Sequence, residues 1–306
     1  MALLGMFARR EDQGGDADRE LGALLAGYSI EVTPRTAAKV DDFRALLPRG
    51  TRVYIAHIDG TPIDDMVATA RRLAGEGFAV MPHLPARGIA DAATLDAWLA
   101  RYREEAGVDQ ALLLAGGAAE PCGAFDSSIA MMRTGLFEKH GYRRLHVAGH
   151  PEGNRDIDPD GSTRVADEAL AWKQDFARRT GVEMAIVTQF AFEAAPIVAW
   201  AERLAQAGIT LPIHVGIAGP TRLQTLIKYA VACGVGPSLR VLRRRAMDVS
   251  KLMLPYEPAE VLRDLAAYRD GHPQGLIRQI HFFPLGGIGA SAEWANARLD
   301  ATGSAA

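Results

Sequence analysis

The sequence of 306 residues contains two cysteines, Cys122 and Cys233, and no apolar run that approaches the roughly 18 residues of a membrane-spanning helix. Two cysteines cannot build a disulfide framework or a thiolate cage for a metal, and their scarcity predicts a reduced, cytoplasmic setting. The basic excess of nucleic-acid-binding proteins is absent as well, because the formal net charge is -3. We therefore expect neither nucleic acid nor a membrane as a partner.

Apolar residues are plentiful, at 48% of the chain against 23% charged residues, which is typical of a globular protein and excludes a disordered or fibrous one. A length of 306 residues is compatible with two average domains, yet α/β barrels of this length form one. No shift of composition marks a boundary inside the chain. We expect one catalytic domain over residues 21–300, preceded by a flexible tail over residues 1–20.

Eight apolar runs of strand length recur without the alternation of a half-buried strand, as is typical of parallel strands covered on both faces. The expected strands are Tyr28–Thr33, Arg52–Ile58, Ala79–Leu84, Gln110–Gly116, Arg144–His150, Met184–Phe190, Leu211–Ile217 and Ile277–Leu285. The segments with helical spacing between them are Pro34–Leu47, Pro62–Gly75, Leu95–Ala106, Arg164–Thr180, Ala195–Ala207 and Arg222–Cys233. We expect several of these helices to end at a glycine cap, as at Gly75, Gly181 and Gly208.

This alternation predicts a single-domain (β/α)8 TIM barrel of the α/β class, with a doubly wound open sheet as the alternative. The long, arginine-rich stretch over residues 236–275 predicts that the last helical layer is elaborated. Barrels of this kind often oligomerise, so a homo-oligomer is compatible with the sequence.

Polar side chains gather at the carboxyl ends of the expected strands, where barrels hold their chemistry. Glu31 lies between Ile30 and Val32, and a carboxylate among apolar neighbours is costly unless it is paired or functional. Desolvation is expected to raise the pKa of Glu31, so that it holds a proton near neutral pH. Gln189 either satisfies a backbone group or binds the amide edge of a ligand.

Histidines occupy several of the other strand ends. His57, His83 and His150 are as compatible with ligand contacts as with hydrogen bonds inside the rim, and the same holds for Glu152 in the loop that follows. A metal centre that combines Asp59 with these histidines is a minor alternative, because no known metal-binding motif accompanies them, and we expect no metal. Three further histidines are expected to pack or pair inside the fold: His146, His214 and His281.

A series of short motifs follows an order that resembles a known family. The motifs are SIEVTP at 29–34, PHL at 82–84, LLLAGG at 112–117, HPEG at 150–153, VTQFAFE at 187–193, GI at 216–217 and HFFPL at 281–285. In this order they are similar to motifs of methylenetetrahydrofolate reductase, the (β/α)8 flavoprotein of one-carbon metabolism. The resemblance extends over nearly the whole chain.

The resemblance implies a folate site and a flavin site. Glu31 takes the position of the family's catalytic glutamate, and Gln189 takes that of its folate-binding glutamine. Tyr229 corresponds to an aromatic residue that stacks on the folate, with Leu223 as a further substrate contact. The residues implied to bind the FAD cofactor are His57, His83, Gly116, Gly117, Phe125, His150, Glu152, Asp167 and Lys173.

The implied cofactor site also departs from the family. The family's Arg-Gly-Asp motif reads AGG at 115–117, so an arginine and an aspartate that contact the flavin are missing. Phe125 takes the place of an adenine-stacking tyrosine. Lys173 is implied to contact a phosphate, and Asp167 or Glu168 a ribose. The folate half of the site is better preserved than the flavin half.

The activity implied by the resemblance interconverts 5,10-methylenetetrahydrofolate and 5-methyltetrahydrofolate, with hydride passing through the flavin and NADH or NADPH recharging it. Glu31 would be the acid that opens the five-membered ring at N10. Loss of the aspartate's negative charge favours a higher flavin potential, which suits oxidation of 5-methyltetrahydrofolate in a demethylation pathway. The incomplete cofactor motif leaves alternatives: direct hydride transfer from a nicotinamide, a folate-binding paralogue without catalysis, a pterin-dependent methyltransferase or a metal-dependent lyase.

Overall fold

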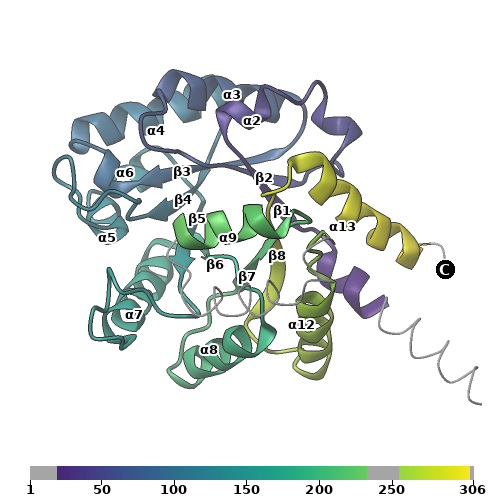
Figure 1. The fold of residues 1–306 in the computed structure, drawn as a ribbon. Helices are drawn as coiled ribbons and strands as arrows, with labels where there is room; N and C mark the ends of the chain where they lie inside the picture. Colours follow the sequence, from purple (N-terminus) through teal and green to yellow (C-terminus); the bar gives the residue numbers. More distant parts are fainter. Residues whose placement is uncertain (1–18, 233–254, 304–306) are drawn as a thin grey trace, which may run out of the picture.

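The computed structural model describes residues 19–232 and 255–303, and its strands form a closed parallel barrel in sequence order (Figure 1). The strands are β1 (Ser29–Val32), β2 (Arg52–Ile55), β3 (Ala79–Pro85), β4 (Gln110–Leu114), β5 (Arg144–Gly149), β6 (Glu183–Thr188), β7 (Ile213–Ala218) and β8 (Ile277–Phe283). Parallel pairing of β1 with β8 closes the barrel, with Ser29 opposite His281. The predicted (β/α)8 barrel is confirmed, and the open sheet is excluded.

Helices surround the strands (Figure 1). They are α2 (Pro34–Ala37), α3 (Ile63–Gly75), α4 (Ala92–Ala106), α5 (Ser128–Met132), α6 (Leu136–Lys139), α7 (Arg164–Thr180), α8 (Ala194–Gln206), α9 (Leu223–Ala232), α12 (Ala259–Gly271) and α13 (Ile288–Gly303), with the 3-10 turns η1 (Phe43–Ala45) and η2 (Ala86–Gly88). Residues 19–25 are also helical, whereas nearly all of the tail expected over residues 1–20 lies outside the described residues.

The prediction of one helix over Pro34–Leu47 is wrong, because the chain forms the short α2 and then η1 instead. Tertiary contacts explain the interruption. The guanidinium group of Arg72 on α3 donates to the backbone carbonyls of Ala37, Val40 and Asp41, so these carbonyls do not need helical partners.

The predicted glycine caps are confirmed at two of the three positions. Gly181 and Gly208 have φ angles of 72° and 81°, in the left-handed region that favours glycine. Gly75 instead is the last residue of α3, and Gly77, with a φ of 91°, ends the turn that follows.

The last helical layer is elaborated, as predicted. The buried residues Leu223 and Leu226 of α9 pack with Phe190 and Phe192, which follow the carboxyl end of β6. In Figure 1, α9 crosses in front of the strands. The outer position after β7 is taken by α12, which packs against α8. Residues 236–254 of the arginine-rich stretch lie outside the described residues.

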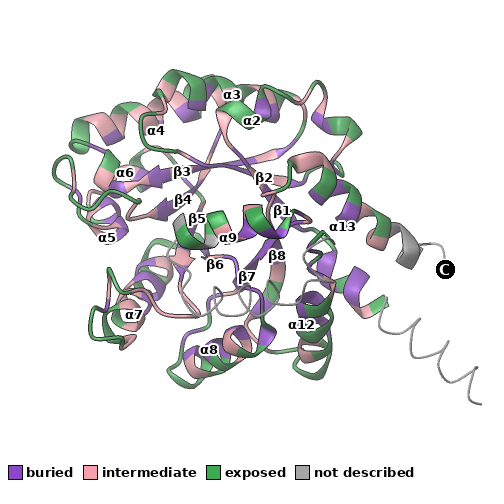
Figure 2. Ribbon diagram, viewed as in Figure 1, coloured by how far each residue is buried: buried purple, intermediate pink, exposed green. Residues whose placement is uncertain are grey.

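The main hydrophobic core fills the space between the strands and the inner faces of the helices (Figure 2). A separate cluster inside the barrel consists of Tyr54, Met81, Leu112 and Val187. Polar residues share this interior and are as deeply buried, namely Ser29, His146, His214 and His281. Within the described ranges, no helix combines the length and apolar character needed to cross a membrane.

Candidate functional site

Glu31 is held between two histidines that come from other strands. Nε2 of His83, on β3, lies 3.2 Å from Oε2 of Glu31, and Nε2 of His281, on β8, lies 3.9 Å from the same oxygen. The Glu31 side chain is 17% exposed, so ligand or solvent reaches it. The three side chains form a cluster of one carboxyl group and two imidazoles at the end of the barrel where the chemistry of this fold is found.

The electrostatics of Glu31 differ from the expectation drawn from sequence. Burial by itself raises the pKa of the carboxyl group, but the opposing effects of His83 and His281 are larger and lower the pKa to about 2. The expectation of a raised pKa is therefore wrong. Apolar chain neighbours indicated burial, but they carried no information about two imidazoles from distant strands.

His281 has a larger part in the site than its expected packing role. Its ring is fully buried, and its Nδ1 is hydrogen-bonded to Oγ of Ser29 at 3.0 Å. The Nε2 atoms of His281 and His83 both lack a hydrogen-bond partner among the described residues, although each faces Glu31. The arrangement can exchange a proton between an imidazole and the carboxylate. The signal in the sequence was the match of His281 to the HFFPL motif.

Residues assigned to the folate lie around the ends of β6 and β7. Oε1 of Gln189 accepts a hydrogen bond of 3.2 Å from the backbone N–H of Phe190, and its amide nitrogen has no hydrogen-bond partner among the described residues. Leu223 is 5% exposed, within the apolar cluster that contains Phe190. Tyr229, on α9, is 41% exposed and presents an aromatic ring to solvent.

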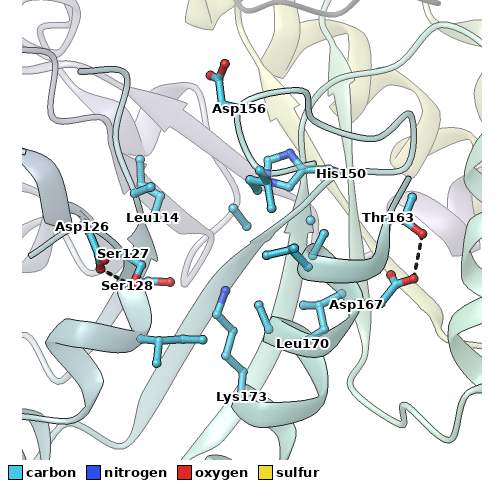
Figure 3. A pocket seen from close by; sticks show the side chains of 18 of the residues that line it. Leu114, Asp126, Ser127, Ser128, His150, Asp156, Thr163, Asp167, Leu170 and Lys173 are labelled. Atoms are coloured by element: carbon cyan, nitrogen blue, oxygen red, sulfur yellow. Dashed lines mark hydrogen bonds between the residues drawn. The ribbon is translucent and has the colours of Figure 1, made fainter. Parts of the chain in front are cut away.

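A cavity of about 400 Å³ lies between the carboxyl ends of β4 and β5 and the start of α7 (Figure 3). Three of the residues assigned to the cofactor line it: His150, Asp167 and Lys173. The sequence did not single out several other lining residues, among them Arg87, Asp126, Ser127, Ser128 and Thr163. The polar lining therefore combines chain segments that are remote from one another in sequence.

The ammonium group of Lys173 lies in this cavity. Its side chain is 8% exposed and points into the open space, and it has no hydrogen bond or ion pair within the described part of the chain (Figure 3). Burial lowers its pKa to about 8, so it remains mostly protonated at neutral pH. Burial and the neighbouring Lys173 lower the pKa of His150 to about 4, so this imidazole is neutral.

Asp167 complements Lys173 in the same cavity. Its Oδ2 accepts hydrogen bonds from Thr163 and Arg203, whereas its Oδ1 is buried and has no partner among the described residues. An unpartnered acceptor and an unpartnered cation suit a ligand that carries both hydroxyl and anionic groups. The ribose-phosphate part of a dinucleotide has this chemistry.

Other residues assigned to the cofactor do not line this cavity. Phe125 is 4% exposed and belongs to the main core. Gly116 forms a turn against Pro85 with a φ of 97°. His57 hydrogen-bonds the carbonyl of Thr61 through Nε2 at 3.0 Å, and its ring packs against Trp98. Two more assigned residues stand outside the lining, Gly117 and Glu152.

The structure gives no support to the alternative of a metal centre. In residues 19–232 and 255–303, no three side chains of histidine, cysteine, aspartate or glutamate are grouped so that they could hold a metal ion. His57, Asp59, His83 and His150 therefore do not form the ligand set considered from the sequence.

The chain matches no protein-family model. Its fold is similar to that of an uncharacterised protein from Clostridium thermocellum, described as binding two copies of 5-methyl-5,6,7,8-tetrahydrofolic acid. That similarity has a TM-score of 0.56 and 12% sequence identity, and it covers 92% of this chain and 98% of the other. At this identity, the comparison establishes a shared fold.

A weaker similarity relates the chain to 7,8-dihydropteroate synthase from Vibrio fischeri ES114, with a TM-score of 0.40 and 12% identity over 89% of this chain and 93% of the other. Dihydropyrimidinase from Brevibacillus agri NCHU1002 gives a TM-score of 0.33 and 9% identity over 66% and 41% of the two chains. Neither of these bears on the site.

Proposed function

We propose that this protein binds a reduced folate at the carboxyl end of the barrel and interconverts 5,10-methylenetetrahydrofolate and 5-methyltetrahydrofolate. The observation that carries the proposal is the position of Glu31 between His83 and His281, at the open end of the barrel and within reach of solvent. Two further points support it. The motif series resembles methylenetetrahydrofolate reductase, and a protein of the same fold is described as binding 5-methyl-5,6,7,8-tetrahydrofolic acid.

Glu31 and its histidines would move the proton that ring opening requires. Reduction of the methylene group needs a proton at N10 of the folate, so that this nitrogen can leave as an amine. Glu31 is ionised at neutral pH, because the two imidazoles lower its pKa. A bound folate that displaces water from the carboxylate would raise the pKa of Glu31, so that Glu31 takes up a proton and passes it to N10.

The folate would occupy the region between β6 and α9. The free amide nitrogen of Gln189 would hydrogen-bond the pterin, and Leu223 would contribute apolar contact from the adjoining cluster. The exposed ring of Tyr229 would stack on the aminobenzoate part of the substrate. Each of these roles follows the resemblance and is compatible with the position of its residue.

The cavity beside α7 fits the ribose-phosphate part of a dinucleotide cofactor such as FAD. Lys173 would pair with a phosphate, and Oδ1 of Asp167 would accept a hydrogen bond from a ribose hydroxyl. FAD, when bound, supplies the hydride chemistry, and NADH or NADPH would recharge it. His57, His83, His150 and Glu152 remain proposed contacts, as do Gly116, Gly117 and Phe125.

A flavin-independent reductase that uses a nicotinamide dinucleotide directly is the second candidate. It is favoured by the buried position of Phe125, which leaves no exposed ring there for an adenine, and by the absence of the family's Arg-Gly-Asp motif. The same Lys173 and Asp167 would then hold the ribose-phosphate part of the nicotinamide cofactor. Both candidates keep the same folate site and the same proton donor.

An absorbance spectrum of the purified protein, before and after addition of FAD and washing, separates the two candidates. The visible absorption bands of a bound flavin would identify a flavoprotein. A colourless protein that oxidises 5-methyltetrahydrofolate with a nicotinamide would identify the direct reaction. Calorimetric titration with 5-methyltetrahydrofolate tests the common part of the proposal. Tight binding without turnover would indicate a non-catalytic folate-binding protein, and absence of binding would refute the folate site.

A further inference from the structure

Lys173 occupies a position on α7 where an amphipathic helix normally carries an apolar side chain. Leu170 and Phe176, three residues before and after it, are buried on the same face of the helix. Lysine is rarely buried this deeply unless an acidic side chain pairs with it. In the part of the chain that the structure describes, Lys173 has neither an ion pair nor a hydrogen bond. Packing or pairing within the fold therefore does not account for this lysine.

The amine of Lys173 faces a cavity whose walls beside α7 are apolar. Ala166, Leu170 and Trp200 line this part of the cavity, which has a volume of about 400 Å³. Figure 3 shows the Lys173 side chain extending into the open space, with the imidazole ring of His150 above it in this view. The amine is thus accessible to a molecule in the cavity, although the residue is almost entirely shielded from bulk water.

The carboxylates around the cavity do not neutralise Lys173. Those that line it belong to Asp126, Asp156 and Asp167. Asp167 is ion-paired with Arg203, and the other two residues are exposed to solvent. Burial therefore determines the pKa of Lys173, which it lowers to about 8. At pH 8 about half of this amine is uncharged, whereas an ordinary lysine, with a pKa of 10.5, is almost entirely protonated.

A second cation lines the cavity across the open space from α7. The guanidinium group of Arg87 donates to the backbone carbonyls of Asp126 and Ala118, at 3.2 and 2.9 Å, and Asp126 lies opposite α7 in Figure 3. These bonds fix the group through Nε and Nη1, so that Nη2 has no partner among the described residues. Arg87 also has no ion pair within residues 19–232 and 255–303. An anionic group on a ligand would complement this arginine.

We propose that Lys173 is a nucleophilic amine, and that the cavity beside α7 binds a small phosphorylated aldehyde through a reversible imine. An accessible lysine that is shielded from water and has no acidic partner is suited to attack a carbonyl group. Arg87 binds the phosphate group of the same molecule across the cavity. The inference goes beyond the proposed function and does not rest on it. A dinucleotide occupies the same space, so the two kinds of ligand exclude each other.

The reaction is balanced, with water as the only other product and no change of oxidation state. The lone pair of the uncharged Lys173 nitrogen attacks the carbonyl carbon, and one proton of this nitrogen moves to the carbonyl oxygen. The resulting carbinolamine loses its hydroxyl group and the remaining N–H proton as water, and a C=N bond forms. His150 carries the proton between the two atoms. Burial and the charge of Lys173 lower the pKa of His150 to about 4, so its imidazole is uncharged and can accept a proton.

Borohydride trapping with pyridoxal 5′-phosphate, an aldehyde that carries a phosphate group, tests the proposal. The chain contains five lysines, so peptide mapping of the reduced adduct identifies the one that reacts. Near pH 8 we expect Lys173 to be labelled at least about tenfold faster than the exposed Lys39 and Lys139, because more of its amine is uncharged. Equal labelling of these lysines would identify adventitious chemistry and overturn the proposal.

Lys173→Arg keeps a cation in the cavity and removes the nucleophile, so the fast adduct should disappear. Lys139→Arg is the matched control, because Lys139 is an exposed lysine paired with Asp96, and it should retain the adduct. Lys173→Met supplies a second substitution if the larger arginine prevents folding. A fast adduct that persists in either folded Lys173 variant would show that another group forms it and would refute the assignment.

The anionic part of the ligand is tested by comparing pyridoxal 5′-phosphate with pyridoxal, which lacks the phosphate group. In the wild type, the phosphorylated aldehyde should reach half-maximal labelling of Lys173 at a concentration at least about tenfold lower. Arg87→Met should remove this difference and leave the reaction with pyridoxal unchanged. Equal half-maximal concentrations in the wild type would overturn the assignment of a phosphorylated ligand.

These measurements are independent of the proposed folate chemistry. Labelling requires neither folate nor flavin, so it decides the inference even if the protein binds no folate and the proposed function fails. Conversely, a protein that turns over 5-methyltetrahydrofolate but shows no preferential labelling of Lys173 would retain the proposed function and refute this inference.

Discussion

Nε2 of His281 lies 3.9 Å from Oε2 of Glu31, although the two residues belong to the last and the first strand of the barrel. They meet because β8 pairs with β1 when the barrel closes, which places His281 opposite Ser29. The proposed proton donor is therefore completed by the same pairing that completes the fold.

The first prediction concerns this donor. Glu31→Gln keeps the shape of the side chain but removes its capacity to hold and release a proton. We expect folate turnover to fall by roughly 10²- to 10⁴-fold, the usual contribution of general acid catalysis, with an unchanged circular dichroism spectrum. Glu138→Gln, at an exposed position of α6, is the control and should retain full activity. Near-normal turnover in Glu31→Gln would remove Glu31 from the mechanism.

The second prediction concerns the cavity cation. Lys173→Met preserves most of the apolar stem and removes the charge that would pair with a cofactor phosphate. We expect the affinity for FAD or a nicotinamide dinucleotide, measured by fluorescence titration, to fall by roughly tenfold or more, since a hydrogen bond to a charged group contributes about 1.5–3 kcal/mol. Lys139→Met removes an exposed lysine that pairs with Asp96 and should leave the affinity unchanged. Equal affinities in the two variants would contradict the assignment.

The same lysine predicts a dependence of stability on pH. Burial lowers the folded pKa of Lys173 to about 8 from 10.5, so between these values the unfolded chain binds more protons than the folded one. The contribution of Lys173 to the free energy of unfolding therefore increases as the pH rises through this range. Urea titrations at several pH values should show this increase in the wild type and its loss in Lys173→Met.

The fourth prediction concerns Arg72, which holds the segment between α2 and η1. Arg72→Ala removes the guanidinium donor from three backbone carbonyls and also removes the ion pair with Glu76. We expect a loss of roughly 2 kcal/mol in the free energy of unfolding, measured by urea denaturation. Arg71→Ala, at the exposed neighbouring position of the same helix, should change stability by less than about 0.5 kcal/mol.

The fifth prediction concerns the contact between β6 and β7. A Cβ atom at Gly216 would lie 2.3 Å from the carbonyl oxygen of Thr188 and 2.7 Å from the ring of Phe283, so Gly216→Ala should destabilise the protein by roughly 1–3 kcal/mol. Gly289→Ala is the control, because a Cβ there would meet no atom within 4 Å beyond its own stretch of helix, and alanine is favoured in a helix. Thermal denaturation of both variants would show whether the close approach is needed.

Local pattern was sufficient to predict most of the secondary structure. The limits of α7 agree with the segment expected from the sequence. Those of α8 differ from it by a single residue at each end, and α9 begins one residue later than expected. Strands β1 to β8 were all expected, with differences confined to their ends. The segment after β1 is the exception: its helical spacing is real, but a side chain from α3 supplies the hydrogen bonds that divide it.

The candidate site could be predicted only in part. Glu31 was identifiable because a carboxylate inside an apolar run has few explanations. The identity of its partners was not, since His83 and His281 meet it through strand pairing that no local window contains. For the same reason the sequence suggested packing for His146 and His281, whereas in the fold Nδ1 of His281 is hydrogen-bonded to Ser29 and Nδ1 of His146 to Tyr54.

The amino-acid sequence by itself determined the order of strands and helices, and with it the barrel, because those depend on hydrophobic periods within a few residues of each other. It also determined that charged side chains would lie at the carboxyl ends of the strands. Only the tertiary structure decided the charge state of Glu31 and the position of Phe125 in the core. It also decided that the ammonium group of Lys173 lines a cavity without a partner among the described residues. Those properties arise from distances between side chains on different strands and helices, and such distances exist only after the barrel has closed.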